Sequence, residues 1–198
     1  MKKRYIILVF ILAVAIFFIM GSASTTSYSN KYYSFEYPHN WTKENDTYNA
    51  YESTTTLYPN YSDLKGKVNI VLTGPEEEPN NYSINDSRDL FIYTNSKVFP
   101  NASYFEDKDL TNDPEFKVLM NKTVTINGMN GFDVVIYDAT PWYLNSPHEI
   151  IEEVMLQKGN KIYTLKLTCS PEALAQDPNI FNSTHREFET VANSFKVT

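Results

Sequence analysis

The hydrophobic and polar residues of this chain first alternate clearly in residues 32–41, which read YYSFEYPHNW. Tyr33, Phe35 and Tyr37 fall on one side of an extended segment, and a proline ends the alternation before Trp41. A period of two is typical of a half-buried strand. The aromatic row can seal the edge of a core or, if its rings are exposed, form a platform on which ligands stack. We favour the core strand.

Two further strands and a helix follow in the first half of the chain. Thr54–Tyr58 and Lys67–Thr73 have strand composition, and Gly74-Pro75 is expected to close the second of them. Ser83 is followed three residues later by an acid, the spacing of a capping box, so a helix is expected from there to Pro100. The apolar face of this helix would carry Leu90, Phe91, Thr94 and Val98.

Two long hairpins are predicted in the second half. Phe116–Ile126 and Phe132–Ala139 flank the loop NGMNG, whose Asn-Gly pairs supply the positive φ that a hairpin loop needs. Glu149–Gln157 and Lys161–Cys169 flank the loop KGN. Alternation in the last strand places Cys169 on its apolar face, which predicts a buried, inert thiol.

A C-terminal helix is predicted to begin at Asp177-Pro178 and to run to about Ser194. Its apolar stripe consists of Phe181, His185, Phe188, Val191, Ala192 and Phe195. Strands, helix, antiparallel hairpins and a closing helix predict an α+β fold, with helices flanking a central antiparallel sheet. We expect the aromatic strand and both hairpins to join in a single sheet, whose dry inner side the last helix closes.

The first 23 residues have the layout of an export signal. Three basic residues precede an uncharged segment from Tyr5 to Met20, and small residues at 21 and 23 suit a signal peptidase. Residues 1–23 are therefore interpreted as a cleaved signal peptide or as an uncleaved transmembrane helix that anchors the chain. Residues 24–30 (STTSYSN) are interpreted as a polar linker, and residues 31–198 as one domain.

Charge and sequons change the picture of possible partners. Beyond residue 23 the chain holds 14 basic and 24 acidic residues, a net charge of about −10. This sign repels phosphate backbones, so nucleic acid is not an expected partner. Eight N-x-[ST] triplets occur where chance would give roughly three, which indicates a glycosylated exported surface or a generally Asn-, Ser- and Thr-rich composition. The candidate acceptors are Asn40, Asn45, Asn60, Asn81, Asn85, Asn101, Asn121 and Asn182.

Candidate chemistry is sparse. No nucleophile elbow, zinc motif or phosphate-binding loop is present, so neither a catalytic residue nor a cofactor is expected. His185 and Glu189 could share a metal ion, although a hydrogen-bonded boundary histidine is favoured. Residues 107–115 alternate oxygen ligands like a calcium loop, but Val118 stands where the last ligand belongs, so a solvated acidic loop is favoured.

Acidic residues within the predicted strands leave one catalytic alternative open. Glu152 and Glu153 lie on opposite faces of an apolar strand, and at least one must find a partner or solvent. With Asp133 or Asp138 from the neighbouring hairpin, they could form a carboxyl pair for acid–base hydrolysis.

The sequence resembles the PsbP-like family over roughly residues 31–197. The resemblance rests on short motifs: Phe35, Tyr37, Pro38 and Trp41, then Ile126, Asn127, Gly128 and Phe132, and finally Ser194 and Phe195. It implies an α/β/α sandwich around an antiparallel sheet, and a binding scaffold in place of a reaction. The family's partner-binding segments cannot be matched to this chain.

These features together predict an exported, membrane-associated, non-catalytic PsbP-like binding or accessory domain. It would lie at the outer face of the cell membrane or outside the cell, and would contact an envelope protein or a small ligand. A secreted hydrolase and a glycosylated structural surface protein are the alternatives.

Overall fold

The computed structural model describes residues 24–44, 46–48, 52–61, 64, 67–77, 83–96, 116–138 and 149–198. The expected signal segment 1–23 and the acidic loop 107–115 lie outside these residues. Among the helices in the described ranges, none has the length and apolar character needed to cross a bilayer.

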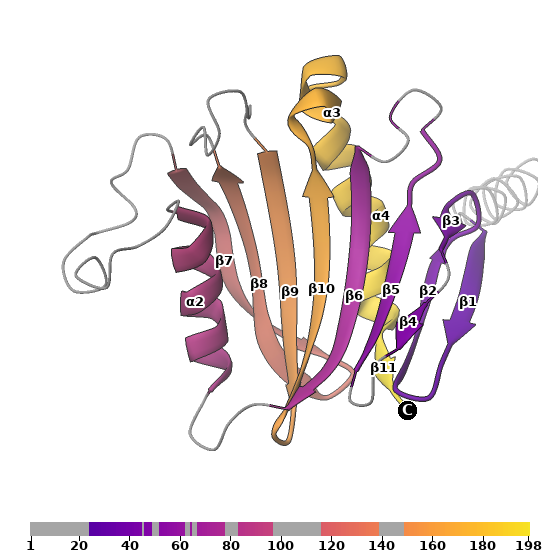
Figure 1. Cartoon of the computed structure of the whole chain (residues 1–198), viewed down its shortest axis with the longest axis vertical. Helices are drawn as coiled ribbons and strands as arrows, with labels where there is room; N and C mark the ends of the chain where they lie inside the picture. The colour runs from indigo at the N-terminus through magenta and orange to yellow at the C-terminus, as the bar shows by residue number, and fades with distance from the viewer. Residues whose placement is uncertain are drawn as a thin grey trace, which may run out of the picture.

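An eight-stranded antiparallel sheet forms the centre of the molecule (Figure 1). Its order is β3-β5-β6-β10-β9-β8-β7, with β4 paired to β5. The strands are β3 (Thr42–Lys43), β4 (Thr47–Tyr48), β5 (Ser53–Tyr58), β6 (Val68–Glu77), β7 (Phe116–Ile126), β8 (Met129–Asp138), β9 (Glu149–Lys158) and β10 (Lys161–Cys169).

A second, three-stranded sheet contains the aromatic segment. It has the order β1-β2-β11, formed by Thr25–Ser29, Tyr33–Pro38 and Lys196–Val197. The prediction of a single sheet is therefore wrong, and so is the polar linker at 24–30, because Thr25–Ser29 pair along β2. The physical reason is that β2 turns its aromatic row onto the last helix instead of extending the large sheet.

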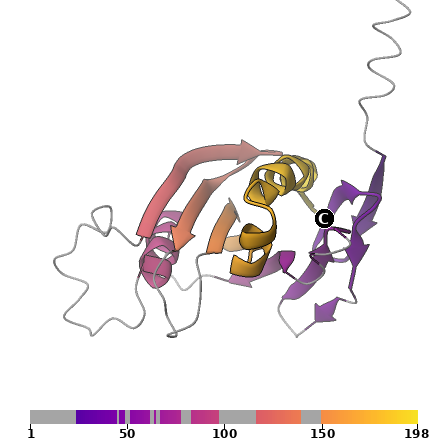
Figure 2. The ribbon, with the colours of Figure 1, turned by 90° about the horizontal axis from the view of Figure 1, so that it is seen from above.

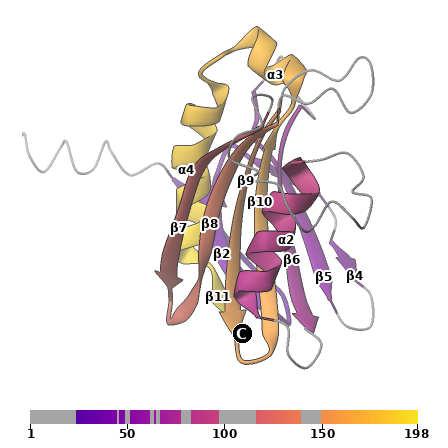
Figure 3. The same cartoon turned by 90° about the vertical axis from the view of Figure 1, so that its left-hand side faces the viewer.

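Helices cover both faces of the large sheet (Figures 2 and 3). On one face, α4 (Ile180–Ser194) lies between the large and small sheets, preceded by the short α3 (Pro171–Gln176). On the other face, α2 (Ile84–Ser96) packs on β8 and β9. The expected α+β arrangement of an antiparallel sheet flanked by helices is thus confirmed.

One core joins the two sheets through α4. It contains Tyr33 and Phe35 of β2, the β10 row that ends at Cys169, and Phe188 and Val191 of α4. Trp41 is 5% exposed, and its indole Nε1–H donates to Glu187 of α4 at 3.0 Å. The buried aromatic residues therefore seal a core, and the alternative of an exposed stacking platform is wrong for them.

A carboxylate also ties the sheets together. Asp46 accepts hydrogen bonds from the hydroxyl of Tyr28 in β1, from Tyr48 at 3.0 Å, from Thr55 of β5 at 2.9 Å and from Lys43 at 3.2 Å. Four donors on one carboxylate make a network that spans both sheets.

Three element boundaries differ from those predicted. Asn127 and Gly128 have positive φ (49° and 80°) and form a two-residue turn, so β8 begins at Met129 and not at Phe132 as predicted. Gly74-Pro75 was expected to end a strand but lies within β6, with a cis peptide bond. The last helix begins at Ile180, three residues after the predicted Asp177.

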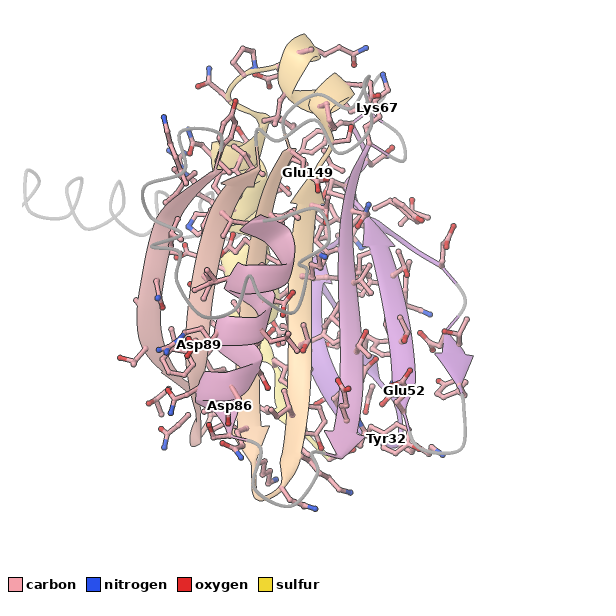
Figure 4. The ribbon with its side chains drawn as sticks, turned by 60° about the vertical axis from the view of Figure 1, so that its left-hand side comes forward. Tyr32, Glu52, Lys67, Asp86, Asp89 and Glu149 are labelled. Carbon is pink, nitrogen blue, oxygen red and sulfur yellow. The ribbon has the colours of Figure 1, made fainter. Side chains whose placement is uncertain are left out.

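The predicted capping box of α2 is confirmed. The backbone N–H and the hydroxyl of Ser83 both donate to Asp86 at 2.7 Å, and the N–H of Asp86 donates to the hydroxyl of Ser83 at 3.3 Å. Asp86 lies in the first turn of α2 (Figure 4). Phe91 packs on the sheet as expected, whereas Leu90 is 46% exposed. The predicted apolar face is therefore wrong at Leu90.

Candidate functional site

Two neighbouring cavities lie between α4 and the strands β7, β8 and β9, and we call them together the α4 groove. One end is a cavity of about 190 Å³ with charged walls, and the other is an apolar cavity of about 350 Å³. The charged end includes Lys122, Asp133, Glu152 and Glu189. The apolar end includes Leu119, Met120, Val135, Ile150 and Phe181.

Strand periodicity explains why the two ends adjoin. Side chains two residues apart on a strand share a face, so Val135 and Asp133 both point toward α4 from β8. The same step separates Met120 from Lys122 on β7. On the helix, residues of the two ends lie about one turn apart. The groove is thus amphipathic along its length.

Asp133 forms the floor of the charged end. It is 6% exposed, and its Oδ2 pairs with Nζ of Lys122 at 3.0 Å, directly across the β7–β8 ladder. Its other oxygen, Oδ1, is buried and has no hydrogen-bond partner among the described residues. A buried acceptor without a donor is costly, and the neighbouring carboxyl group of Glu152 can supply that donor when it is protonated.

Glu152 lies beside Asp133 and is held by α4. It is 1% exposed, and its Oε2 is 2.7 Å from Nδ1 of His185. Burial, opposed by the bond to His185 and assisted by the nearby carboxylate of Asp133, raises the pKa of Glu152 to about 7. The bond to Glu152 in turn raises the pKa of His185. The pair therefore retains a proton near neutral pH.

That proton gives Asp133 one internal donor. Glu152 lies within hydrogen-bonding reach of Asp133, so a protonated Glu152 can donate to it, whereas an ionised Glu152 cannot. The floor of the groove is consequently an acid pair whose hydrogen bonding depends on a single proton.

The structure places the other predicted site residues apart from this cluster. Glu153 faces the opposite side of the sheet next to Lys166, and burial raises its pKa to about 7. The side chain of Asp138 lies outside the described part. The predicted carboxyl pair is therefore formed by Asp133 and Glu152.

The histidine and cysteine predictions are confirmed in their structural form. His185 is a hydrogen-bonded boundary residue, with Glu189 at 3.8 Å from its Nε2. Within the described ranges, no three His, Cys, Asp or Glu side chains are arranged to hold a metal ion. Cys169 is buried, which raises the pKa of its thiol to about 12.

Five of the candidate glycosylation sites lie in the described part, and all five are exposed: Asn40, Asn60, Asn85, Asn121 and Asn182. Asn45, Asn81 and Asn101 lie outside it. A wider hollow of about 550 Å³ near Asn40 is lined by surface residues such as His39 and Arg186, and it contains no buried charge.

This architecture, an antiparallel sheet flanked by helices with a small second sheet beside it, is similar to the PsbP-like fold. The solution structure of cyanobacterial PsbP (CyanoP) from Synechocystis sp. PCC 6803 matches 90% of this chain and 95% of its own, with a TM-score of 0.50 and 18% identity. The resemblance expected from the sequence is thereby confirmed at the level of the fold.

Two more distant structures are also similar. A crystal structure from Bacteroides thetaiotaomicron VPI-5482 covers 89% of this chain and 49% of that chain, with 11% identity and a TM-score of 0.49. The crystal structure of LpqN, described as involved in cell envelope biogenesis of Mycobacterium tuberculosis, matches 88% of this chain and 91% of its own. The identity is 8% and the TM-score is 0.40. The sequence matches no family model and no curated protein.

Proposed function

We propose that this chain is an exported accessory domain that binds a small ligand in the α4 groove and catalyses no reaction. The observation that carries the proposal is a cavity of about 190 Å³ beside α4, whose lining includes Lys122 and the buried carboxyl groups of Asp133 and Glu152. Ligand sites combine apolar walls with a few convergent polar groups, and the two ends of the α4 groove supply both.

The bonding of the charged groups favours binding over catalysis. Oδ2 of Asp133 is paired with Lys122, and Oε2 of Glu152 is paired with His185. Each carboxyl group is therefore already fixed by a partner. Groups fixed in this way on two strands and one helix form a preorganised recognition surface.

Export and membrane association belong to the same proposal. They rest on the basic and apolar residues 1–23, on the acidic charge of the remainder, and on eight sequons of which the five described ones are exposed. Mass spectrometry of the protein from its own cells would show a chain without residues 1–23, or an intact anchor, and glycan masses on the sequons. A cytoplasmic, unmodified full-length chain would contradict export.

Native mass spectrometry of the full chain tests ligand binding. The wild-type protein should carry a non-covalent small molecule, which Ala192→Phe should exclude because this helix residue lines the charged end. Thr190→Phe, on the same helix but outside the α4 groove, is the matched control. Equal occupancy in both variants, or none in the wild type, would contradict a ligand site in the α4 groove.

A hydrolase is the second candidate, because Asp133 and Glu152 share one cavity and burial raises the pKa of Glu152 to about 7. Such a pair is suited to acid–base work. Turnover of glycoside or ester substrates by the wild type, lost in Glu152→Gln with the fold intact, would replace the binding proposal by this one.

A further inference from the structure

The backbone pairing of the small sheet begins directly after residue 23. Thr25 is the first residue of β1 and lies opposite Pro38 of β2. The backbone N–H of His39 donates to the carbonyl oxygen of Ser24 at 2.9 Å, so Ser24 is held by the same pairing. Residue 23 is therefore followed at once by a strand and not by a flexible linker.

The length of the segment 1–23 sets how close an anchored fold would lie to a bilayer. Residues 5–23 contain no charged side chain. A helix needs about 20 residues to cross the hydrocarbon core, so an uncleaved anchor would use all of them. No residues would remain for a tether, and Ser24 would lie at the level of the lipid headgroups. The protein surface around Ser24 would consequently touch the bilayer.

A hollow of about 550 Å³ lies at this point of the surface, and we call it the β1–α4 hollow. Ser24 and His39 line it beside the small sheet, and Arg186 and Thr190 line it from α4. It shares no lining residue with the α4 groove. In Figure 2 the small sheet lies at one side of the molecule and α2 at the other. The hollow therefore adjoins the point at which an anchor would enter the fold, on the side away from α2.

The exposed charge of the β1–α4 hollow suits a phosphate group. Arg186 is exposed and forms no ion pair with any residue in the described ranges. Glu187 is the acid of the lining, and its Oε2 already accepts hydrogen bonds from Trp41 at 3.0 Å and from Tyr61 at 3.1 Å. A guanidinium group binds phosphate oxygens through parallel N–H donors. Arg186 is consequently available to a phosphate at the mouth of this hollow.

The acidic remainder of the chain favours this side over others. Beyond residue 23 the net charge is about −10, and two of the acids, Asp86 and Asp89, are exposed on α2 (Figure 4). An anionic bilayer attracts basic side chains near its surface and repels acidic ones. The position of Ser24 and the charge of Arg186 therefore select the same side of the protein to face lipid.

We propose, resting on the membrane association proposed above, that residues 1–23 stay attached and that the β1–α4 hollow rests on the bilayer with a phospholipid phosphate on Arg186. The domain then has one orientation, with α2 turned away from the membrane. The α4 groove stays accessible, because none of its lining residues belongs to the hollow.

Fluorescence quenching in vesicles tests this orientation on the full chain. Thr190→Cys places a thiol in the β1–α4 hollow, and Asp89→Cys on α2 is the control. A thiol-reactive fluorophore labels each new site, because Cys169 is buried. The vesicles contain phosphatidylglycerol and a phospholipid with a nitroxide quencher on its headgroup. The label at residue 190 should lose most of its fluorescence, whereas the label at residue 89 should keep it.

A second variant tests the phosphate contact. Arg186→Glu should reduce the loss of fluorescence at residue 190, because it reverses the charge that faces the headgroups. Lys158→Glu, the same change of charge at the exposed end of β9, should leave that loss as it is. Thermal unfolding confirms that each variant folds. An unchanged loss in Arg186→Glu would overturn the phosphate contact.

The remaining outcomes separate this proposal from the proposed function. A loss at residue 89 that equals the loss at residue 190, or no loss at either, would overturn the docking while export and ligand binding stand. A native chain that lacks residues 1–23 would also overturn it and would still support export. A glycan on Asn40 of the native chain would fill the hollow that it lines, which rules out the lipid contact but again supports export.

Discussion

The buried Glu152–His185 pair should make the folded protein less stable as the pH rises. Glu152 has an ordinary pKa of 4.5, which burial raises to about 7 in the folded chain, and the pKa of His185 is also raised. A raised folded-state pKa means that the folded state holds a proton that the unfolded state has released. This stabilisation is complete below pH 4.5 and is lost as the pH rises through about 7.

The size of the effect follows from the size of the pKa change. Each tenfold change in proton affinity corresponds to 1.36 kcal/mol, so a rise from 4.5 to about 7 gives at most about 3 kcal/mol. Because His185 shares the same proton, we expect about 2 kcal/mol less stability at pH 8 than at pH 5 from this pair. Removing the carboxylate by Glu152→Gln should abolish this part of the slope.

Urea unfolding at pH 5, 6, 7 and 8, followed by the fluorescence of buried Trp41, measures the slope. Glu36→Gln, which removes an exposed carboxyl group on the small sheet, is the control and should leave the slope unchanged. Burial also raises the pKa of Glu153 to about 7, so Glu153→Gln should remove a separate part of the slope. A Glu152→Gln variant with the same pH dependence as the wild type would refute the assignment of the proton to this pair.

Three further experiments test the fold. Gly131→Ala should lower the free energy of unfolding in urea by at least about 2 kcal/mol, because its Cβ would lie 1.8 Å from the carbonyl oxygen of Met155. Gly128→Ala is the control: the space around it is open, so it should cost only about 1 kcal/mol. The buried thiol of Cys169 should resist iodoacetamide at pH 8 until the chain is unfolded, so native labelling measured by mass spectrometry would contradict its burial. Asp46→Asn should cost about 2 kcal/mol in the same urea assay, since it weakens four hydrogen bonds, one of which comes from the small sheet and three from the large sheet. An unchanged unfolding midpoint would contradict that role.

The hairpins could be predicted because their signals are local. Alternation with a period of two and Asn-Gly turns lie within a few residues of each other, so β7 to β10 and the burial of Cys169 follow from the sequence. The small sheet could not be predicted, because β1 consists mainly of Ser and Thr and β11 has only two residues. Both strands are defined by backbone pairing with β2, which no local pattern reveals.

Only part of the candidate site could be predicted from the sequence. Asp133 and Glu152 stood out as charges within apolar strands, but the pairing of Asp133 with Lys122 depends on the strand register. A two-residue turn places these residues opposite each other, whereas the predicted five-residue loop would pair Lys122 with Ile136. The error in the turn therefore hid the ion pair.

The contact of Glu152 with α4 required the position of the helix itself. His185 was recognised as part of the apolar stripe, yet nothing in the stripe identifies the strand that it meets. The packing of α4 between two sheets supplies that information, because it brings residue 185 over β9.

The seat of α4 between the two sheets also sets an order for assembly. A ribosome delivers the chain from its N-terminus, so all strands of the large sheet exist before the residues of α4 and β11 emerge. Until then the row from Tyr163 to Cys169 has no cover, and β2 lacks both its helix and its second neighbour. The nascent chain therefore exposes an apolar surface that favours aggregation until α4 and β11 have been synthesised and cover it.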